Sequence, residues 1–162
     1  MDEHKLNQIG SRKEFHDAIR AALVLAADAD AGEICLVDAD FQDWPLNERA
    51  VVEALARWAT SRRKLVIYAH SFDALPRIAP RFSEWRRQWS HIVQCRTDPD
   101  LEAQQVPTLL LVPGELAVRL LDPVRHRGTV SGRASDQVQC REAIDALLQR
   151  SVEAFPPTTL GL

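Results

Sequence analysis

Two short apolar runs, separated by a segment with helical periodicity, restrict the fold of this sequence most. Residues Glu33–Asp38 and Lys64–Ala69 each have the length and apolar character of a buried strand. The segment 47–59 between them carries apolar residues at helical spacing, and Asn47 is expected to cap it. A strand, a helix and a second strand in this order form a βαβ unit, in which the two strands are parallel.

Further helices are expected on both sides of this unit. Ser11 and Glu14 form a capping box, and the apolar spacing that follows predicts a helix over 12–28. Asp73 is expected to cap a helix that runs to about Trp89. Because proline removes a backbone donor, we predict that this helix breaks at Pro80.

The second half of the chain contains the signature of a β-hairpin. Two apolar runs, 106–112 and 116–121, are separated by Pro113-Gly114-Glu115, a short turn sequence. Another short strand is predicted at His91–Cys95. We therefore expect antiparallel pairing in this half of the sheet.

The order of these elements predicts the fold class. A last helix is expected to begin with Ser135 as its cap, to carry Val152 on its apolar face and to end at Pro156–Pro157. The order α-β-α-β-α-β-β-β-α predicts an α/β fold with a mixed β-sheet flanked by helices on both faces. We expect one domain over 1–162, with its core in about 9–152 and with a polar N-terminal and a Pro-containing C-terminal tail.

Composition disfavours several kinds of partner. The 162 residues carry a net charge of −3, so no global attraction to nucleic acid or anionic lipid is expected. No apolar run approaches the ~20 residues that cross a bilayer, and the polar start is not a signal peptide. We expect a cytoplasmic protein without membrane contact, cofactor or metal. Each of Cys35, Cys95 and Cys140 lies in an apolar segment, which is typical of reduced core thiols.

The predicted order of elements resembles one half of the phospholipase D fold, over roughly residues 9–152. The segment Pro80–His91 is also similar to a family of bacterial proteins and accessory domains with this architecture. Single-half members of the superfamily commonly pair into dimers. The resemblance therefore implies a bacterial protein that forms a homodimer or binds a protein partner.

The catalytic motif of phospholipase D enzymes is absent from this sequence. The motif HxKxxxxD places a nucleophilic His and a phosphate-binding Lys near the hairpin. Laid on this strand, the motif puts Val106 at the His position, Thr108 at the Lys position and Pro113 at the Asp position. None of these side chains supplies the nucleophile, the positive charge or the carboxylate. The resemblance thus implies a non-catalytic interaction or dimerisation module.

An alternative hypothesis is a Mg²⁺-dependent phosphohydrolase. Asp38 and Asp40 follow a buried strand, where α/β sheets place ligand groups. Such a DxD resembles the first motif of haloacid-dehalogenase-like phosphatases, and Ser71 resembles their second. We expect His70, at the end of the next strand, to lie near both carboxylates and to be able to act as acid or base. The opposing interpretation is a solvated loop with an ordinary surface histidine.

Arginines suggest a third hypothesis, a regulator that binds a nucleotide, a small phosphate-containing ligand or nucleic acid. One set surrounds the aromatic helix and comprises Arg81, Arg86, Arg87 and Arg96. The second set lies before the last helix and comprises Arg125, His126, Arg127 and Arg133. Guanidinium groups grip phosphates, whereas the acidic net charge argues against an extended nucleic-acid groove. Trp44, in a loop, either covers an edge of the core or docks a partner.

Overall fold

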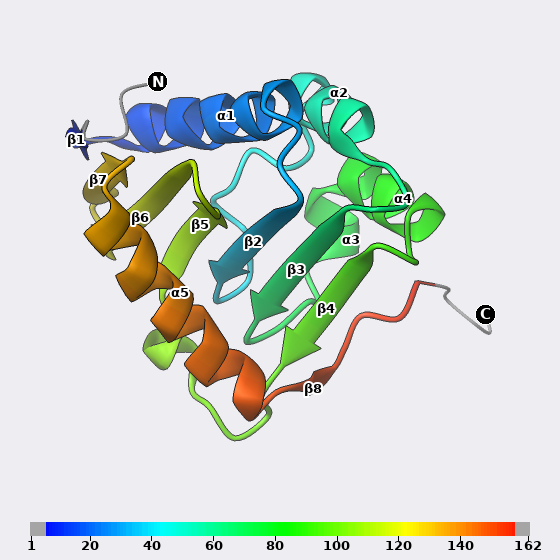
Figure 1. The fold of residues 1–162 in the computed structure, drawn as a ribbon. Helices are drawn as coiled ribbons and strands as arrows, with labels where there is room; N and C mark the ends of the chain where they lie inside the picture. The colour runs from blue at the N-terminus through cyan, green and yellow to red at the C-terminus, as the bar shows by residue number, and fades with distance from the viewer. Residues whose placement is uncertain (1–5, 158–162) are drawn as a thin grey trace.

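An eight-stranded mixed sheet in residues 6–157, the part of the chain that the computed structural model describes, forms the centre of the molecule (Figure 1). Its strands follow the order β1-β7-β6-β5-β2-β3-β4-β8. The strands are β1 (Leu6–Ile9), β2 (Glu33–Asp38), β3 (Lys64–Ala69), β4 (Val93–Thr97), β5 (Thr108–Val112), β6 (Leu116–Asp122), β7 (Arg127–Ser131) and β8 (Val152–Glu153). The helices are α1 (Arg12–Asp28), α2 (Arg49–Trp58), α3 (Leu75–Ile78), α4 (Pro80–Gln88), α5 (Ala134–Gln149) and the 3₁₀ helix η1 (Ala103–Gln105). Within these residues no helix has the length and apolar character that a bilayer span requires.

The local patterns predicted the centre of the sheet correctly. β2 and β3 are parallel and joined through α2, which confirms the βαβ unit. β5 and β6 are antiparallel and meet at a tight turn, which confirms the hairpin; Gly114 there takes a φ of +84°, which favours glycine. α1 spans the predicted residues, and the Ser11 hydroxyl accepts a hydrogen bond from the Glu14 N–H. β5 also pairs antiparallel with β2, which makes the sheet mixed.

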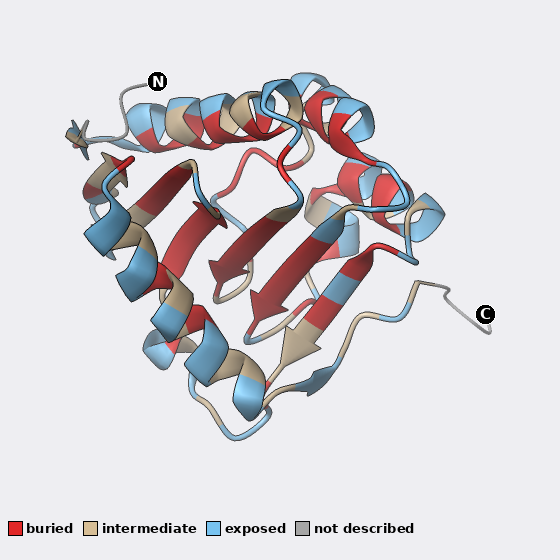
Figure 2. Ribbon diagram, in the orientation of Figure 1, coloured by how far each residue is buried: buried red, intermediate tan, exposed pale blue. Residues whose placement is uncertain are grey.

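Helices cover both faces of this sheet, as the fold class required. Successive residues of β2 point to opposite faces. Ile34 and Leu36 pack in a core with residues of α1, α2 and α4. Cys35 and Val37 pack in a second core with Ile144 of α5 (Figures 1 and 2). Figure 2 shows the central strands buried and the outer sides of the helices exposed. The α/β prediction is confirmed.

Two predicted caps in the first half of the chain are wrong. Asn47 does not cap α2, which begins after Glu48. Its Oδ1 instead accepts the Arg81 N–H at 2.9 Å, because α4 packs beside α2 and its first turn leaves N–H groups free. Asp73 gives α3 no side-chain cap, because the N-cap position belongs to Ala74; the Asp73 N–H donates to the Ser71 hydroxyl in a turn before the helix.

The predicted cap of the last helix is also wrong. Ser135 lies within the first turn of α5, and the N-cap residue is Arg133. The Ser131 hydroxyl accepts the Arg133 N–H at 3.1 Å and donates to Asp136 at 2.5 Å. This serine, at the end of β7, therefore fixes the entry into α5.

The end of that helix was placed too far along the chain. α5 ends at Gln149, so Val152 lies in β8 and Pro156–Pro157 does not stop the helix. The Arg96 guanidinium holds the turn, donating from Nε to the Ser151 hydroxyl and from Nη2 to its carbonyl, each at 2.8 Å. These bonds direct the chain away from the helix and along β4.

Strands at the edges were not predicted from the sequence. β1 and β7 are short and pair with one another, and β7 also pairs with β6. Gly128 allows β7 to approach β6, because a Cβ at this position would lie 1.9 Å from the Arg119 carbonyl oxygen. β4 begins at Val93, two residues later than predicted, because Ile92 closes a turn onto the Trp89 carbonyl.

Candidate functional site

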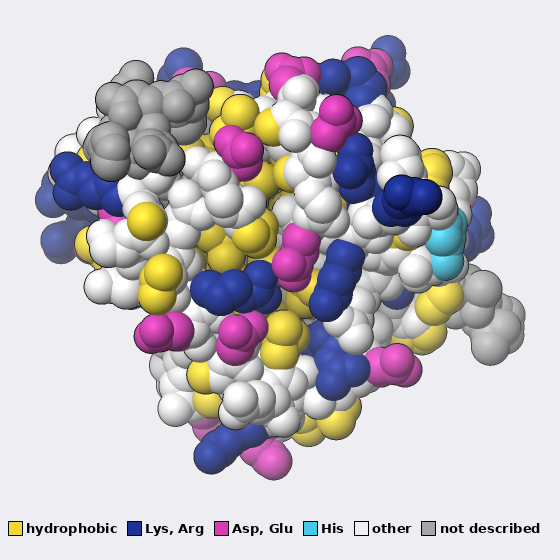
Figure 3. All heavy atoms as spheres, in the orientation of Figure 1, with side chains coloured by type: hydrophobic (Ala, Val, Ile, Leu, Met, Phe, Trp, Pro, Cys, Tyr) yellow, Lys and Arg dark blue, Asp and Glu magenta, His cyan; other side chains and the backbone are white. Residues whose placement is uncertain are grey.

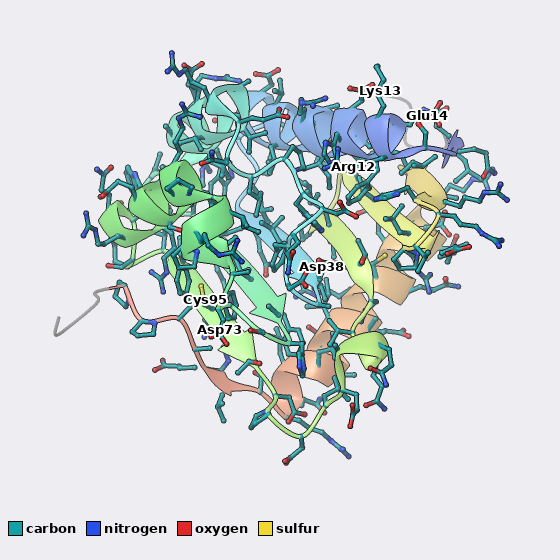
Figure 4. The ribbon with its side chains drawn as sticks, turned by 180° about the vertical axis from the view of Figure 1, so that it is seen from behind. Arg12, Lys13, Glu14, Asp38, Asp73 and Cys95 are labelled. Atoms are coloured by element: carbon teal, nitrogen blue, oxygen red, sulfur yellow. The ribbon has the colours of Figure 1, made fainter. Side chains whose placement is uncertain are left out.

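A pocket of about 710 Å³ opens where the loop after β2 meets the start of β5. Its walls come from Phe15 of α1, the segment 38–44, the segment 103–108 and the turn between β6 and β7. Figure 4 shows Asp38 at the end of β2 and Arg12 on the side of α1 that faces this loop. The sheet edge proposed from the sequence is therefore a hollow in the structure.

Asp38 is buried at the base of this pocket and held by its neighbours. The Thr108 hydroxyl donates to Oδ1 at 2.5 Å, and the Phe41 N–H donates to Oδ2 at 2.8 Å. Phe41 takes a φ of +62°, which turns the loop around the carboxylate. Burial raises the pKa of Asp38 above its ordinary value, and the hydrogen bonds from Thr108 and Phe41 only partly oppose this.

The strand that would carry the missing motif presents only neutral side chains to the pocket. Val106 and Thr108 both line it. Val106 lies before β5 rather than in it, because its N–H closes η1 onto the Ala103 carbonyl. Pro113 lies in the turn beyond the far end of β5. The three positions of the motif thus provide no nucleophile, cation or carboxylate here.

A second carboxylate, Asp43, joins several elements at the rim. Its Oδ1 accepts from Arg12 Nε at 3.2 Å, and its Oδ2 lies 3.0 Å from His126 Nε2. Its backbone oxygen lies 2.6 Å from Nε2 of His16, a buried residue of α1. Burial opposes ionisation, but the hydrogen bonds from Arg12 and His126 outweigh it and lower the pKa of Asp43. Sequence reasoning missed Asp43 and His16, because 83 positions separate Asp43 from His126 and 27 positions separate it from His16.

His70 and Ser71 do not join the two carboxylates of the DxD sequence. His70 Nδ1 lies 2.9 Å from the Leu101 carbonyl oxygen, and the residue is not among those that line the pocket. The Ser71 N–H donates to the Ala39 carbonyl, but its hydroxyl accepts the N–H of Asp73. Asp40 lines the pocket and accepts hydrogen bonds from Gln42. The predicted group of Asp38, Asp40, His70 and Ser71 is therefore only partly assembled.

The second arginine set does not gather in the pocket. His126 is the member that lines the pocket, whereas Arg125 is exposed and 4.0 Å from Asp122. Arg127 is exposed on β7, and Arg133 precedes α5. On the face shown in Figure 3, basic and acidic side chains are interspersed.

The first arginine set is largely engaged within the protein. Arg81 donates to the Asn47 carbonyl, Arg87 pairs with Glu84, and Arg96 binds Ser151. Arg86 differs from the others because its side chain is buried.

Trp44 covers an edge of the core and also contributes to the pocket. Its ring is buried, 4.9 Å from the Phe41 ring and 5.6 Å from the Phe15 ring, edge to face in both pairs. Over residues 6–157 no cluster of three or more His, Cys, Asp or Glu side chains is arranged to hold a metal ion.

Solved structures of two proteins resemble this one. The first is TrmBL2, an archaeal chromatin protein described as showing a novel mode of DNA binding, with a TM-score of 0.65 and 14% identity over 95% of this chain. The chain spans 55% of the TrmBL2 chain. The second is Nuc, a phospholipase D family member from Salmonella typhimurium, with a TM-score of 0.61 and 9% identity, covering 94% of this chain and 100% of that one. No family model matches the sequence, and no curated protein matches it significantly. The chain has a phospholipase D-like fold.

Proposed function

We propose that this chain is a non-catalytic phospholipase D-like domain of one half, which acts as a dimerisation or protein-interaction module. The observation that carries this proposal is the pairing of Thr108 with Asp38 in the pocket. A hydroxyl that donates to a buried carboxylate occupies the place at which the motif requires a phosphate-binding lysine. The site thus lacks the charge that phosphodiester cleavage needs.

The charges around the pocket support the same conclusion. Asp38, Asp40 and Asp43 all line it, and His126 is bound to Asp43. Phosphoryl transfer depends on cations aimed at the phosphate oxygens. Carboxylates at this place repel a phosphodiester instead, so the pocket disfavours the substrate of the phospholipase D reaction.

An apolar surface beside the pocket supports the module. Leu121, near the end of β6, is 67% exposed, and Val124, in the turn between β6 and β7, is 89% exposed. Val124 and Pro123 also line the pocket. The sequence resembles one half of the phospholipase D fold, and single-half members of that superfamily commonly pair. We take a second copy of this chain as the partner that covers the turn.

Analytical ultracentrifugation across micromolar concentrations tests this proposal. We expect a dimer for the native chain and a shift toward monomer for Val124→Asp, because a charge would then be buried in the interface. Val138→Asp on α5 is the matched control, since Val138 is also exposed and lies on another element. A native chain that stays monomeric at every concentration would refute the dimer.

Hydrolysis of bis(p-nitrophenyl) phosphate distinguishes the module from an enzyme. We expect no turnover above the buffer rate, with or without Mg²⁺. Turnover that Asp38→Asn abolishes would instead support the phosphohydrolase alternative, built on Asp38 and Asp40.

Similarity to TrmBL2 favours one further candidate, a nucleic-acid-binding regulator. Among residues of the second arginine set, Arg125 and Arg127 are exposed and could contact phosphates. DNA binding that weakens as salt rises and is lost in Arg125→Ser/Arg127→Ser would support it. Binding that is absent, or that does not depend on salt, would exclude it.

A further inference from the structure

Arg86 belongs to α4, and its side chain is buried against β4 and the C-terminal segment 152–157, away from the pocket described above. The residue is only 4% exposed. Its Nη2 donates to the Phe155 carbonyl at 3.0 Å, and its Cζ lies 5.6 Å from the centre of the Phe155 ring. Figure 1 shows this segment running past β4 and α4 toward the C-terminus. Phe155 thus covers one side of the guanidinium group.

The rest of that guanidinium group has no acceptor among residues 6–157 other than the thiol of Cys95, which is a weak one. Nε and Nη1 are both buried without a hydrogen bond, and no carboxylate in that part of the chain lies within 4.0 Å of Arg86. The nearest acid along the helix, Glu84, is bound to Arg87. A guanidinium group stays protonated in proteins, so a full positive charge is buried here without a counter-ion among residues 6–157.

The neighbouring thiol of Cys95 does not supply the missing negative charge. Burial raises the pKa of Cys95 to about 11, and the nearby Arg86 guanidinium lowers it only in part. The thiol is therefore neutral at physiological pH. Because an uncompensated buried charge is strongly unfavourable, the surroundings of Arg86 favour an anion from outside the chain.

Space and a second donor are available beside Arg86. A hollow of about 200 Å³ is lined by Arg86 and Ser83, with Pro76, Pro80, Pro156 and Pro157 among its walls. The Ser83 hydroxyl is also buried without a hydrogen-bond partner. A second hollow of about 460 Å³ reaches Arg86 from the side of Cys95. A guanidinium group and a hydroxyl that both lack acceptors form the donor set that an oxyanion satisfies.

We propose that Arg86 and Ser83 form a binding site for a small oxyanion, a carboxylate or phosphate group, beneath the C-terminal segment. Access requires displacement of that segment. β8 is only two residues long, and Phe155 takes a φ of +47°, which is unfavourable for an aromatic residue. Its ring stacks on the ring of Phe72, with 5.4 Å between the ring centres.

Thermal unfolding at constant ionic strength tests this site, with phosphate, acetate and chloride as three separate salts. A ligand that binds the folded state raises the Tm in proportion to the logarithm of its concentration above Kd. We expect phosphate, acetate or both to raise the Tm of the native chain above its value in chloride. A response to phosphate alone assigns a phosphate group to the site, and a response to acetate alone assigns a carboxylate.

Variants separate binding at the site from the general stabilisation that excluded salts produce. Arg86→Met keeps the length of the side chain and removes the charge, so the rise in Tm that phosphate or acetate produces over chloride should disappear. The Tm of this variant in chloride should not fall below that of the native chain, because no unpaired charge is buried in it. Arg87→Met is the matched control, since Arg87 is exposed and paired with Glu84, and it should keep the full rise. Ser83→Ala should reduce the rise in Tm without abolishing folding.

Two results would overturn the proposal. One is a native Tm that is the same in all three salts. The other is a Tm rise that is equal in the native chain and in Arg86→Met. Should Arg86→Met fail to fold, Arg86→Lys serves instead, because lysine keeps the charge and lacks the planar guanidinium group. A salt-dependent rise in the Tm of Arg86→Lys as large as that of the native chain would count against the site.

Discussion

Replacing Thr108 by valine tests whether the hydroxyl of this residue stabilises a buried, ionised Asp38. The substitution conserves shape and removes the donor that lies 2.5 Å from Asp38 Oδ1. Asp38 keeps the hydrogen bond from the Phe41 N–H. The carboxylate therefore stays buried with one fewer strong donor.

The magnitude follows from the charge and from the position of the bond. A hydrogen bond to a charged group contributes about 1.5–3 kcal/mol to the free energy of unfolding. Asp38 lines the pocket, so water replaces part of what is lost, which places the expected loss near the lower limit, at about 1.5 kcal/mol. For a chain of this length that loss lowers the Tm by about 3–6 °C.

The sign of the pH dependence provides a second readout. The folded pKa of Asp38 lies above its ordinary value of 3.8, so its contribution to stability is complete below 3.8 and is lost as the pH rises through the raised pKa. Thr108→Val raises that pKa further, because it removes a bond to the charged form. The stability difference between the two proteins should therefore be smaller at a pH below 3.8, where Asp38 is protonated in both, than at neutral pH.

Urea unfolding at the two pH values, followed by circular dichroism, measures both effects. Thr97→Val is the matched control, since the Thr97 hydroxyl is partly exposed and donates to the neutral His70 carbonyl; we expect a change within about 0.5 kcal/mol. A loss for Thr108→Val no larger than that of the control, or one equal at both pH values, would refute the reasoning about Asp38.

Two further predictions follow from packing. Gly128→Ala should lower the free energy of unfolding by about 3 kcal/mol or more, because the new Cβ would lie 1.9 Å from the Arg119 carbonyl oxygen. Gly32→Ala is the control: its Cβ would meet no atom within 4 Å, so the change should stay within about 0.5 kcal/mol. Equal urea midpoints for the two variants would contradict this prediction. The three cysteines are buried, and burial raises the pKa of the thiols, to about 12 for Cys35 and about 11 for Cys95. We therefore expect Ellman's reagent to leave all three thiols unmodified in the folded protein at mildly alkaline pH and to modify all three in urea. Rapid labelling of the folded protein would contradict this, because it would show that the thiols are accessible.

Local sequence patterns predict the centre of this fold because the forces that set it are local. The strands β2 and β3 and the hairpin β5–β6 follow from apolar runs and turn residues that lie close in the chain. Of the three strands that the sequence did not reveal, β1 and β8 depend on partners far along the chain, whereas β7 pairs with the neighbouring β6 but has no continuous apolar run to mark it. Gly128 illustrates this, since its need for a close approach to Arg119 becomes visible only once β6 and β7 pair.

The site was predicted only where topology alone decides it. The ends of β2 and β3 meet at one edge, which placed Asp38 and Asp40 beside a pocket. Topology does not fix the direction of a side chain in the loop that follows, so His70 turns to Leu101 instead. The link from Asp43 to Arg12 and His126 joins three separate segments and has no local signal.

Charge explains why a shared fold need not carry a shared activity. The HxKxxxxD motif of phospholipase D enzymes uses a lysine to bind the phosphate of the substrate, and such a lysine is useful only where no carboxylate of the protein takes its charge first. Here Thr108 and Asp38 satisfy one another, and a cation placed at Thr108 would pair with Asp38 rather than with a phosphate. The carboxylates at positions 40 and 43 add to the same repulsion at the pocket. The loss of activity that we propose therefore extends beyond the motif residues to the loop after β2, and restoring the motif alone leaves a pocket whose charge opposes the substrate.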